Sequence, residues 1–213
     1  HDPWGHWETP ENHTRESPAN RKTGLKKIEQ TAGQNSGSRM SLSDQVRALV
    51  RDVPDFPKPG ILFKDITPVT QNSEALKGIC DWIADIARDR NATTIAGIES
   101  RGFIFAAGAA VQSGLGITLI RKEGKLPAET LSEKYALEYG EAIMEVHTDA
   151  FSKEDRVLVV DDLLATGGTA EAACRLVDRM GAHVAGCLFV IELTFLKGRA
   201  RLTDRDVLSL VGY

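Results

Sequence analysis

A loop of two glycines between two threonines, close to an acidic pair, is the part of the sequence with the clearest chemistry. The stretch consists of the aliphatic run 157–160, then Asp161 and Asp162, and then Thr166-Gly167-Gly168-Thr169. Glycine lets backbone N–H groups turn inward around an anion, and a following helix adds the positive end of its dipole. The threonine hydroxyls are additional donors. The loop therefore predicts a site for a phosphate monoester.

The acidic pair indicates what the phosphate belongs to. Asp161 and Asp162 would repel a bare phosphate, but carboxylates suit sugar hydroxyls or a Mg²⁺ ion that the ligand carries. The loop is neither the G-x-x-x-x-G-K-[ST] loop of nucleoside triphosphatases nor the G-x-G-x-x-G dinucleotide loop. The expected ligand is a phosphorylated sugar. We expect Gly167→Val to block this anion pocket while leaving the fold intact.

Buried strands and amphipathic helices should position the loop. The run 157–160 indicates a strand buried on both faces, and 171–180 indicates a helix, so the loop lies at the carboxyl end of a strand. Open α/β sheets bind ligands there. Further strands are expected at 61–66, 93–98, 117–120, 143–146, 184–193 and 207–211, and further helices at 42–50, 73–90 and from Phe103 onward.

Two more segments with binding chemistry follow predicted strands. Glu99-Ser100-Arg101-Gly102 comes between the strand 93–98 and the next helix, so a hydroxyl, a guanidinium and the N–H groups of a helix start converge there. That combination suits a pyrophosphate. The second segment is the charged run 121–127 after the strand 117–120; a charge run is usually a solvated face, but this one also lies at a strand end.

In family terms, these segments resemble the type I phosphoribosyltransferases. The stretch 157–170 resembles their motif for phosphoribosyl pyrophosphate (PRPP), and 99–102 resembles their pyrophosphate turn. The run 121–127 resembles their Arg-Lys-x-Gly-Lys-Leu-Pro segment. The resemblance covers roughly 46–211, with the motifs in family order. It implies a doubly wound, mostly parallel α/β sheet with a small N-terminal hood.

The base is indicated by two other segments, 61–66 and Leu137-Glu138-Tyr139-Gly140, which are most similar to family members that use adenine. The resemblance implies that adenine and PRPP give AMP and pyrophosphate in purine salvage, with Mg²⁺ bound mainly through the substrate. Two alternatives stay open. One is a related enzyme for hypoxanthine, guanine, xanthine or orotate. The other is a non-catalytic regulator that senses PRPP, although residues 1–39 are too few and too weakly basic for a winged helix.

The resemblance also implies roles for individual residues. The phosphate and ribose of PRPP and AMP would be bound by Asp161, Asp162, Leu163, Leu164, Ala165, Thr166, Gly167, Gly168 and Thr169. Pyrophosphate would be bound by Glu99, Ser100, Arg101, Arg121, Lys122 and Lys125. Adenine would be bound by Leu62, Phe63, Lys64 and Leu193, where Lys64 stands in place of a frequent arginine. The catalytic group would be Glu138, Tyr139 and Arg101.

Glu138 and Tyr139 lie at the end of a polar segment, 128–140, that has no clean period and is expected to be a mobile lid. A carboxyl group at the N7 edge of the purine could ease the loss of the ring proton, which is the role expected for Glu138. Tyr139 could help to hold the closed form. Arg101 would stabilise the negative charge on the leaving pyrophosphate.

Composition sets the outer limits of the interpretation. The chain has 213 residues, 42% hydrophobic and 26% charged, which is typical of one soluble globular domain. Its net charge is −4 and its pI about 5.8, which argues against nucleic-acid and anionic membrane partners. The uncharged run 102–120 is expected to be a helix, a glycine turn and a strand, not a membrane span. Three separated cysteines predict buried free thiols and a cytoplasmic location.

The ends of the domain and its assembly complete the predictions. Residues 1–39 are polar, with few aliphatic side chains, and are expected to be a disordered extension or tag. The phosphoribosyltransferase domain would then be 40–213. Because the segment 121–125 reaches a neighbour's site in this family, the resemblance implies a homodimer.

Overall fold

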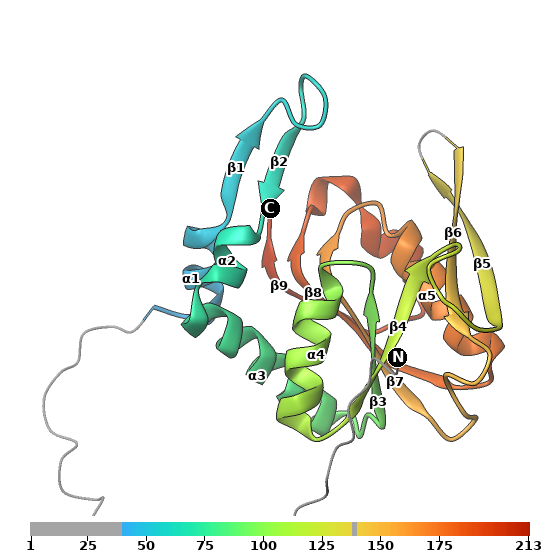
Figure 1. Ribbon diagram of the computed structural model, residues 1–213. Helices are drawn as coiled ribbons and strands as arrows, with labels where there is room; N and C mark the ends of the chain where they lie inside the picture. Colours follow the sequence, from blue (N-terminus) through green and yellow to red (C-terminus); the bar gives the residue numbers. More distant parts are fainter. Residues whose placement is uncertain (1–39, 138–139) are drawn as a thin grey trace, which may run out of the picture. The chain divides into compact units, whose positions relative to one another are not determined.

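The aliphatic runs of the sequence form the inner strands of a seven-stranded sheet. The computed structural model describes residues 40–137 and 140–213 (Figure 1). The predictions for residues 1–39, and for Glu138 and Tyr139, lie outside the described residues. The strands of the sheet are β3 (Thr94–Ile98), β4 (Gly116–Lys122), β5 (Thr130–Leu137), β6 (Gly140–His147), β7 (Arg156–Leu164), β8 (His183–Glu192) and β9 (Val207–Gly212).

The strand order is β5-β6-β4-β3-β7-β8-β9, and the inner strands are parallel. From β3 the chain builds β4 on one side and later β7, β8 and β9 on the other. The register places Ile98 beside Ile120, and Leu164 beside Glu192, so the carboxyl ends lie at one edge. The boundary between β3 and β7 is therefore the switch point at which sheets of this type bind ligands. This confirms the predicted fold class.

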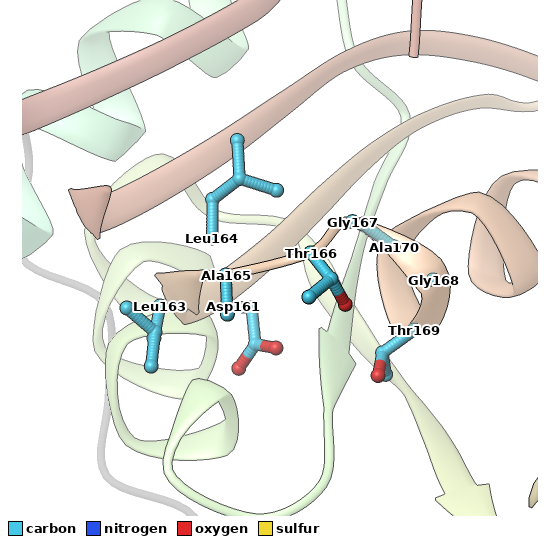
Figure 2. A pocket seen from close by; sticks show the side chains of 9 residues that line it. All are labelled: Asp161, Leu163, Leu164, Ala165, Thr166, Gly167, Gly168, Thr169 and Ala170. Atoms are coloured by element: carbon cyan, nitrogen blue, oxygen red, sulfur yellow. The ribbon is translucent and has the colours of Figure 1, made fainter. Parts of the chain in front are cut away.

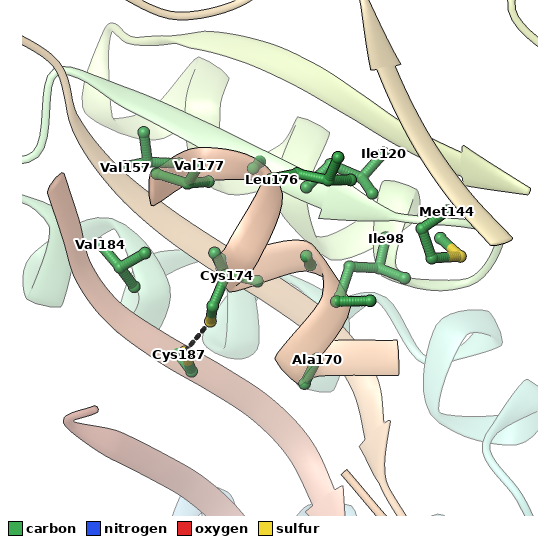
Figure 3. Packing of buried hydrophobic residues seen from close by; sticks show 14 of the residues in the cluster. Ile98, Ile120, Met144, Val157, Ala170, Cys174, Leu176, Val177, Val184 and Cys187 are labelled. Atoms are coloured by element: carbon green, nitrogen blue, oxygen red, sulfur yellow. Dashed lines mark hydrogen bonds between the residues drawn. The ribbon is translucent and has the colours of Figure 1, made fainter. Parts of the chain in front are cut away.

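Helices cover both faces of the sheet, and the alternation along β7 shows how. Val157 and Val159 belong to a core with α5 (Gly168–Arg179), whereas Leu158 and Val160 belong to a second core. Figure 3 shows the first core, in which the Sγ atoms of Cys174 and Cys187 are 3.4 Å apart. The second core also contains side chains of α1 (Leu42–Leu49), α2 (Thr67–Gln71), α3 (Ser73–Asp89) and α4 (Gly102–Ser113).

The hood, defined here as residues 51–65, forms a separate two-stranded sheet. Its antiparallel strands are β1 (Arg51–Pro54) and β2 (Leu62–Asp65), with Val53 opposite Phe63 and Asp52 opposite Lys64. Figure 1 shows that the hood and the hairpin of β5 and β6 both project beyond the same end of the sheet. Two short 3-10 helices, η1 (Thr194–Leu196) and η2 (Gly198–Arg201), follow β8.

Several local predictions are confirmed. Ser41 caps α1 by accepting the N–H of Asp44 at 3.1 Å, and α4 ends at Gly114 with a φ of +73° before β4 begins. All three cysteines are free and buried.

Among the helices in the described residues, none has the length and apolar character needed to cross a membrane.

The segment 128–140, whose sequence shows no clean period, forms a regular strand over most of its length. Residues 130–137 form β5, which pairs along its whole length with β6. Polar residues are frequent because the hairpin buries one face only, with Tyr135 in the core and Glu133 paired to arginines of α5. A role of this hairpin as a lid stays a prediction. The short strand β1 and helix α2 were not predicted either.

Candidate active site

The loop 166–169, called the phosphate loop after the ligand predicted for it, is a tight connection between β7 and α5. Gly167 adopts a φ of +84°, which L-residues rarely adopt, and α5 begins at the next residue. A Cβ at Gly167 would lie 2.4 Å from the carbonyl oxygen of Gly198, so η2 packs directly against the loop. Glycine is therefore required for both the backbone angle and the space. Gly198 was missed by the sequence analysis.

A cavity of about 70 Å³ lies within this loop. It is lined by Asp161 and residues 163–170. All of these except Ala170 were predicted to bind the phosphate and ribose. In Figure 2 the polar groups of Asp161, Thr166 and Thr169 point to one side of the loop, and Leu164 points to the other. The cavity offers backbone N–H groups at a helix start and two hydroxyls, which is the chemistry of an anion site.

The acidic pair is part of β7 itself, just before the loop. Asp162 is only 5% exposed, and its Oδ2 lies 2.7 Å from Nε of Arg101, an ion pair without good hydrogen-bond geometry. Asp161 lines the cavity, and its Oδ1 accepts the N–H of Asp162 at 2.8 Å. Burial, and next the charge of Asp162, raise the pKa of Asp161 well above its ordinary value. The two carboxylates thus lie in different environments.

The turn after β3 packs tightly against the acidic pair. A Cβ at Gly102 would lie 2.7 Å from Oδ1 of Asp161 and 2.9 Å from the carbonyl oxygen of Val160, so glycine permits this close approach. The peptide between Glu99 and Ser100 is cis. The structure therefore brings together two predicted segments, 99–102 and 161–169, that are far apart in the sequence.

Glu99 connects the turn with the basic segment after β4. Its Oε2 accepts from Nε of Arg121 at 3.0 Å and from the N–H of Lys122 at 3.2 Å. Arg121 also donates to the carbonyl oxygen of Lys125 at 2.8 Å. Lys122 and Lys125 have exposed side chains. The basic residues that were assigned to pyrophosphate are thus held at the same edge as Arg101, with Glu99 as their anchor.

The buried carboxylate of Glu145, which the sequence analysis missed, also supports this segment. Glu145 lies on β6 and is 8% exposed. Its Oε2 accepts the N–H of Gly124 at 2.9 Å, and its Oε1 accepts from the hydroxyl of Ser132 at 3.2 Å. The basic segment is therefore tied both to the turn after β3 and to the hairpin of β5 and β6.

Beside the phosphate loop lies a larger cavity of about 330 Å³ under the hood. It is lined by Val53, Phe56, Phe63, Asp65 and Arg101. The rings of Phe56 and Phe63 meet edge to face, with centroids 5.1 Å apart, and Cζ of Arg101 is 5.8 Å from the centroid of Phe63. Aromatic walls with few polar groups suit a flat heterocyclic ring. Of these residues, Val53, Phe56 and Asp65 were missed.

The other residues that were assigned to the base lie around this region. Leu62 is 50% exposed. Lys64 places Nζ 2.6 Å from Oδ1 of Asp52 and 4.3 Å from the ring centroid of Tyr213. Leu193 is partly buried, and its N–H donates to the carbonyl oxygen of Leu164 at 2.9 Å, which places it beside the end of β7. Contacts of these three residues with a base stay predictions.

The described residues contain no cluster of three or more His, Cys, Asp or Glu side chains that could hold a metal ion. The acidic pair offers two carboxylates, one of which is paired with Arg101. Mg²⁺ commonly binds through one or two carboxylates together with substrate phosphates and water. The residues therefore fit a metal that enters with a phosphorylated ligand.

Comparisons with known proteins agree with this geometry. A family model described as "Phosphoribosyl transferase domain" matches residues 65–208. The adenine phosphoribosyltransferase of Nitrosococcus oceani is 52% identical over 170 residues, 80% of this chain and 99% of the relative. That of Methylococcus capsulatus is 54% identical over 170 residues, with the same coverage of 80% and 99%.

Solved structures show the same similarity. The adenine phosphoribosyltransferase of Thermoanaerobacter pseudethanolicus superposes with a TM-score of 0.77 at 46% identity, covering 80% of this chain and 99% of that one. The enzyme of Saccharomyces cerevisiae, solved with adenine and an imino-altritol bisphosphate, has a TM-score of 0.75 at 35% identity, covering 79% and 98%.

Proposed function

The chain belongs to the phosphoribosyltransferase family, and on this basis we propose that it transfers the 5-phosphoribosyl group of PRPP to adenine, producing AMP and pyrophosphate. In the reaction the bond from ribose C1 to the pyrophosphate oxygen breaks, and a bond from C1 to adenine N9 forms. The observation that carries the proposal is the meeting of an anion loop, an acidic pair and an aromatic cavity at the switch point between β3 and β7.

Each part of this arrangement suits one part of the substrates. The loop 166–169 would bind the 5′-phosphate, and Asp161 and Asp162 would bind the ribose hydroxyls. The cavity at Phe56 and Phe63 would hold the purine. These assignments place ribose C1 between the acidic pair and the hood.

Departure of pyrophosphate is the step that the cations support. Positive charge develops on the ribose and negative charge on the leaving group as the C1–O bond breaks, so preorganised cations lower the barrier. Arg101, Arg121, Lys122 and Lys125 would serve this purpose, with Ser100 as an additional donor. Arg101 is paired with Asp162, so PRPP would take over both partners, pyrophosphate binding Arg101 and ribose binding Asp162.

Magnesium, the cofactor implied by the family, would be held by the diphosphate oxygens of PRPP with support from Asp161 or Asp162. When bound it would neutralise charge on the leaving group. The residues of the chain still have to bind the sugar, position the base and exclude water.

Glu138 is proposed to handle the proton that adenine loses as N9 attacks, with Tyr139 holding the closed hairpin over the base. We expect Glu138→Gln to lower kcat roughly tenfold to a thousandfold, because it removes the titrating group and keeps its shape. Affinity for PRPP should change little. Single-turnover measurement of AMP formation tests this, and an unchanged rate would show that the carboxyl group has no part in the chemical step.

The experiment that tests the overall proposal is a comparison of bases. Adenine, hypoxanthine, guanine, xanthine and orotate are each incubated with PRPP and Mg²⁺, and release of pyrophosphate is measured. We expect fastest turnover of adenine. Faster turnover of a different base would identify a related enzyme, and PRPP binding without turnover of any base would identify a PRPP-sensing protein.

A homodimer is part of the proposal, and an exposed apolar face supports it. Ile104 and Val111 of α4 are 44% and 84% exposed, and Ile117 and Leu119 of β4 are also exposed. Among the described residues, β4 pairs with β6 only at Arg121 and Lys122, so its other backbone groups on that edge face outward. A second copy covering this face would lie next to the segment 121–125.

Light scattering tests the assembly, with an expected mass near twice that of the chain. Val111→Glu should shift the protein toward monomer, because it places a charge in the covered apolar face. A monomer with full activity at assay dilution would contradict this part of the proposal. The buried free cysteines further support a reducing compartment, which we propose to be the cytoplasm.

A further inference from the structure

The hood needs an anchor, because it shares no strand pairing with the main sheet. Isolated two-stranded hairpins are marginally stable in water, so its position depends on side-chain contacts. Successive residues of a strand point to opposite faces. The cavity under the hood, which is proposed to hold the base, is called the base cavity below. On β2, Phe63 and Asp65 line this cavity, and Lys64 lies between them. Contacts of Lys64 therefore act on the face of the hood that points away from the base.

Lys64 makes two contacts on that face. Its Nζ lies 2.6 Å from Oδ1 of Asp52, which is the cross-strand partner of Lys64 within the hood. The same Nζ lies 4.3 Å from the ring centroid of Tyr213, and the Lys64 side chain is only 13% exposed. The contact with Asp52 stays within the hood, whereas the contact with Tyr213 connects the hood to the main sheet.

Tyr213 is firmly attached to the main sheet. It follows β9, its N–H donates to the carbonyl oxygen of Glu192 at 2.9 Å, and its carbonyl oxygen accepts the N–H of Thr194 at 2.9 Å. Cζ of Arg47 on α1 is 5.1 Å from the ring centroid, so the ring contacts cations from two other elements. The hydroxyl group is buried without a hydrogen-bond partner in the described part of the chain. The ring, not the hydroxyl, therefore makes the connection.

We propose that Tyr213 is a positioning residue for the base: its ring holds Lys64, and through Lys64 it keeps the hood in the orientation that presents Phe63 to the base cavity. This inference rests on the proposed function, because it describes how the base site of that reaction is built. It assigns Lys64 an indirect role, in which its ammonium group contacts Tyr213 and Asp52 and the base contacts the other face of β2.

Steady-state kinetics of Tyr213→Leu provide the test. The KM for adenine should rise roughly threefold to tenfold, the scale of losing a cation–π contact at a partly buried site, and the KM for PRPP should stay within about twofold. Tyr213→Phe should restore the wild-type KM for adenine, because it keeps the ring and removes a hydroxyl without a partner. A rise in both KM values, or a Phe variant as impaired as the Leu variant, would overturn the proposal.

A double-mutant cycle tests the route through Lys64. Lys64→Met should raise the KM for adenine to a similar degree, and adding Tyr213→Leu should then cause little further change. Multiplicative effects of the two substitutions would mean that Lys64 and Tyr213 act independently, which contradicts the proposal. If Tyr213→Leu does not fold, the Lys64→Met variant alone is used. An unchanged KM for adenine in that variant would overturn the proposed role of the contact between Lys64 and Tyr213.

The wild-type protein in the same assay separates this inference from the proposed function. Failure of the wild type to convert adenine would remove the proposed function itself. Normal turnover by the wild type, with unaltered KM values in the Tyr213 and Lys64 variants, would remove only the positioning role.

Discussion

The phosphate loop and the hood, which are the two binding regions of the proposed function, are built in different ways. The loop joins β7 to α5, two elements of one buried core, and its cavity is lined by Asp161 and the consecutive residues 163–170, two of which are glycines. The hood is a separate two-stranded sheet whose cavity is formed by side chains, among them Phe56 and Phe63. A site made of backbone N–H groups suits the same phosphate in every substrate, whereas a site made of side chains can be adjusted to one base. Arg101 lies between the two regions, paired with Asp162 just before the loop and with its Cζ 5.8 Å from the ring centroid of Phe63 in the hood.

Gly167→Ala tests the rigid side of this comparison and should have the largest effect. A Cβ there would meet the carbonyl oxygen of Gly198 at 2.4 Å, on a backbone with a φ of +84°. The loop must therefore move, and affinity for AMP should fall roughly a thousandfold, the scale of losing two charge-assisted hydrogen bonds. Calorimetric titration with AMP measures this.

The same clash applies to Gly167→Val, whose Cβ would also meet the carbonyl oxygen of Gly198, so this substitution must displace the loop or η2; that the rest of the fold stays intact remains a prediction. Gly114→Ala is a matched control, since its φ is +73° but a Cβ would meet nothing within 4 Å. Gly114→Ala should lose some stability and keep its AMP affinity. Equal AMP affinity in both variants would show that the loop does not bind the phosphate.

Arg101→Met tests the connection between the two regions. It removes the partner of the buried Asp162 carboxylate and a cation from the base cavity. We expect kcat/KM for PRPP to fall about a hundredfold, the usual cost of losing one preorganised charge-stabilising group, and the KM for adenine to rise as well. Arg88→Met, on the exposed face of α3, is the control. An effect on adenine alone would separate Arg101 from the pyrophosphate.

Asp161→Asn tests whether the carboxyl group of Asp161 serves substrate binding at a cost in stability of the fold. The raised pKa of Asp161 means that the protonated carboxyl favours the folded state; this contribution is complete below the pKa of the unfolded chain and is lost as pH rises through the folded value. Ionisation of Asp161 therefore costs the folded state stability. Asn should raise the Tm at pH 7, with a smaller difference near pH 3, while the KM for PRPP rises about tenfold.

Asp155→Asn is the matched control for this pH dependence. A hydrogen bond from the Thr93 side chain, followed by one from the Ser152 N–H, lowers the pKa of Asp155 below its ordinary value. Its charged form therefore stabilises the fold above the unfolded pKa, and this contribution is lost as pH falls through the folded value. Asn at this position should lower the Tm at pH 7. If thermal scans at pH 7 show the Tm changing in the same direction in both variants, the explanation is contradicted.

Phe56→Leu tests the adjustable side and should have the smallest effect. It removes the edge-to-face contact with Phe63 but keeps an apolar wall. We expect the KM for adenine to rise about threefold, as for loss of one aromatic pair, with no change for PRPP. Steady-state kinetics with each substrate varied in turn provide the measurement. An equal rise for PRPP would mean that the hood and the phosphate loop are not separate binding regions.

The two regions also differ in how well the sequence predicts them. The phosphate loop could be predicted because its strand, glycines and helix are consecutive, so local propensity and loop chemistry agree. Its dependence on Gly198 could not be predicted, because that packing joins segments separated by α5, β8 and η1. The alternation of apolar strands and amphipathic helices likewise indicated the main sheet. The period of β5 was hidden because Glu133, on the same face of the strand as Tyr135, is charged and pairs with arginines of α5.

The hood was harder to predict. Phe56 lies in a proline-rich segment in which no period indicates the direction of its ring, and β1 is too short to show alternation. The contact between Lys64 and Tyr213 joins two ends of the domain, and no spacing rule predicts such a pair. Of the residues in the base cavity, Phe63 was therefore found through the family resemblance alone.

The order of strands has a consequence for how the protein is made. β3 and β7 are neighbours in the sheet, but β4, β5 and β6 lie between them in the chain. Pairing strands so distant in sequence is slow, because the intervening chain must first lose its freedom. During synthesis, the turn 99–102 leaves the ribosome well before the Asp161 backbone against which Gly102 packs. A nascent chain that stalls before β7 therefore carries the turn 99–102 on an open sheet edge, and the proposed site can form only after β7 has been made.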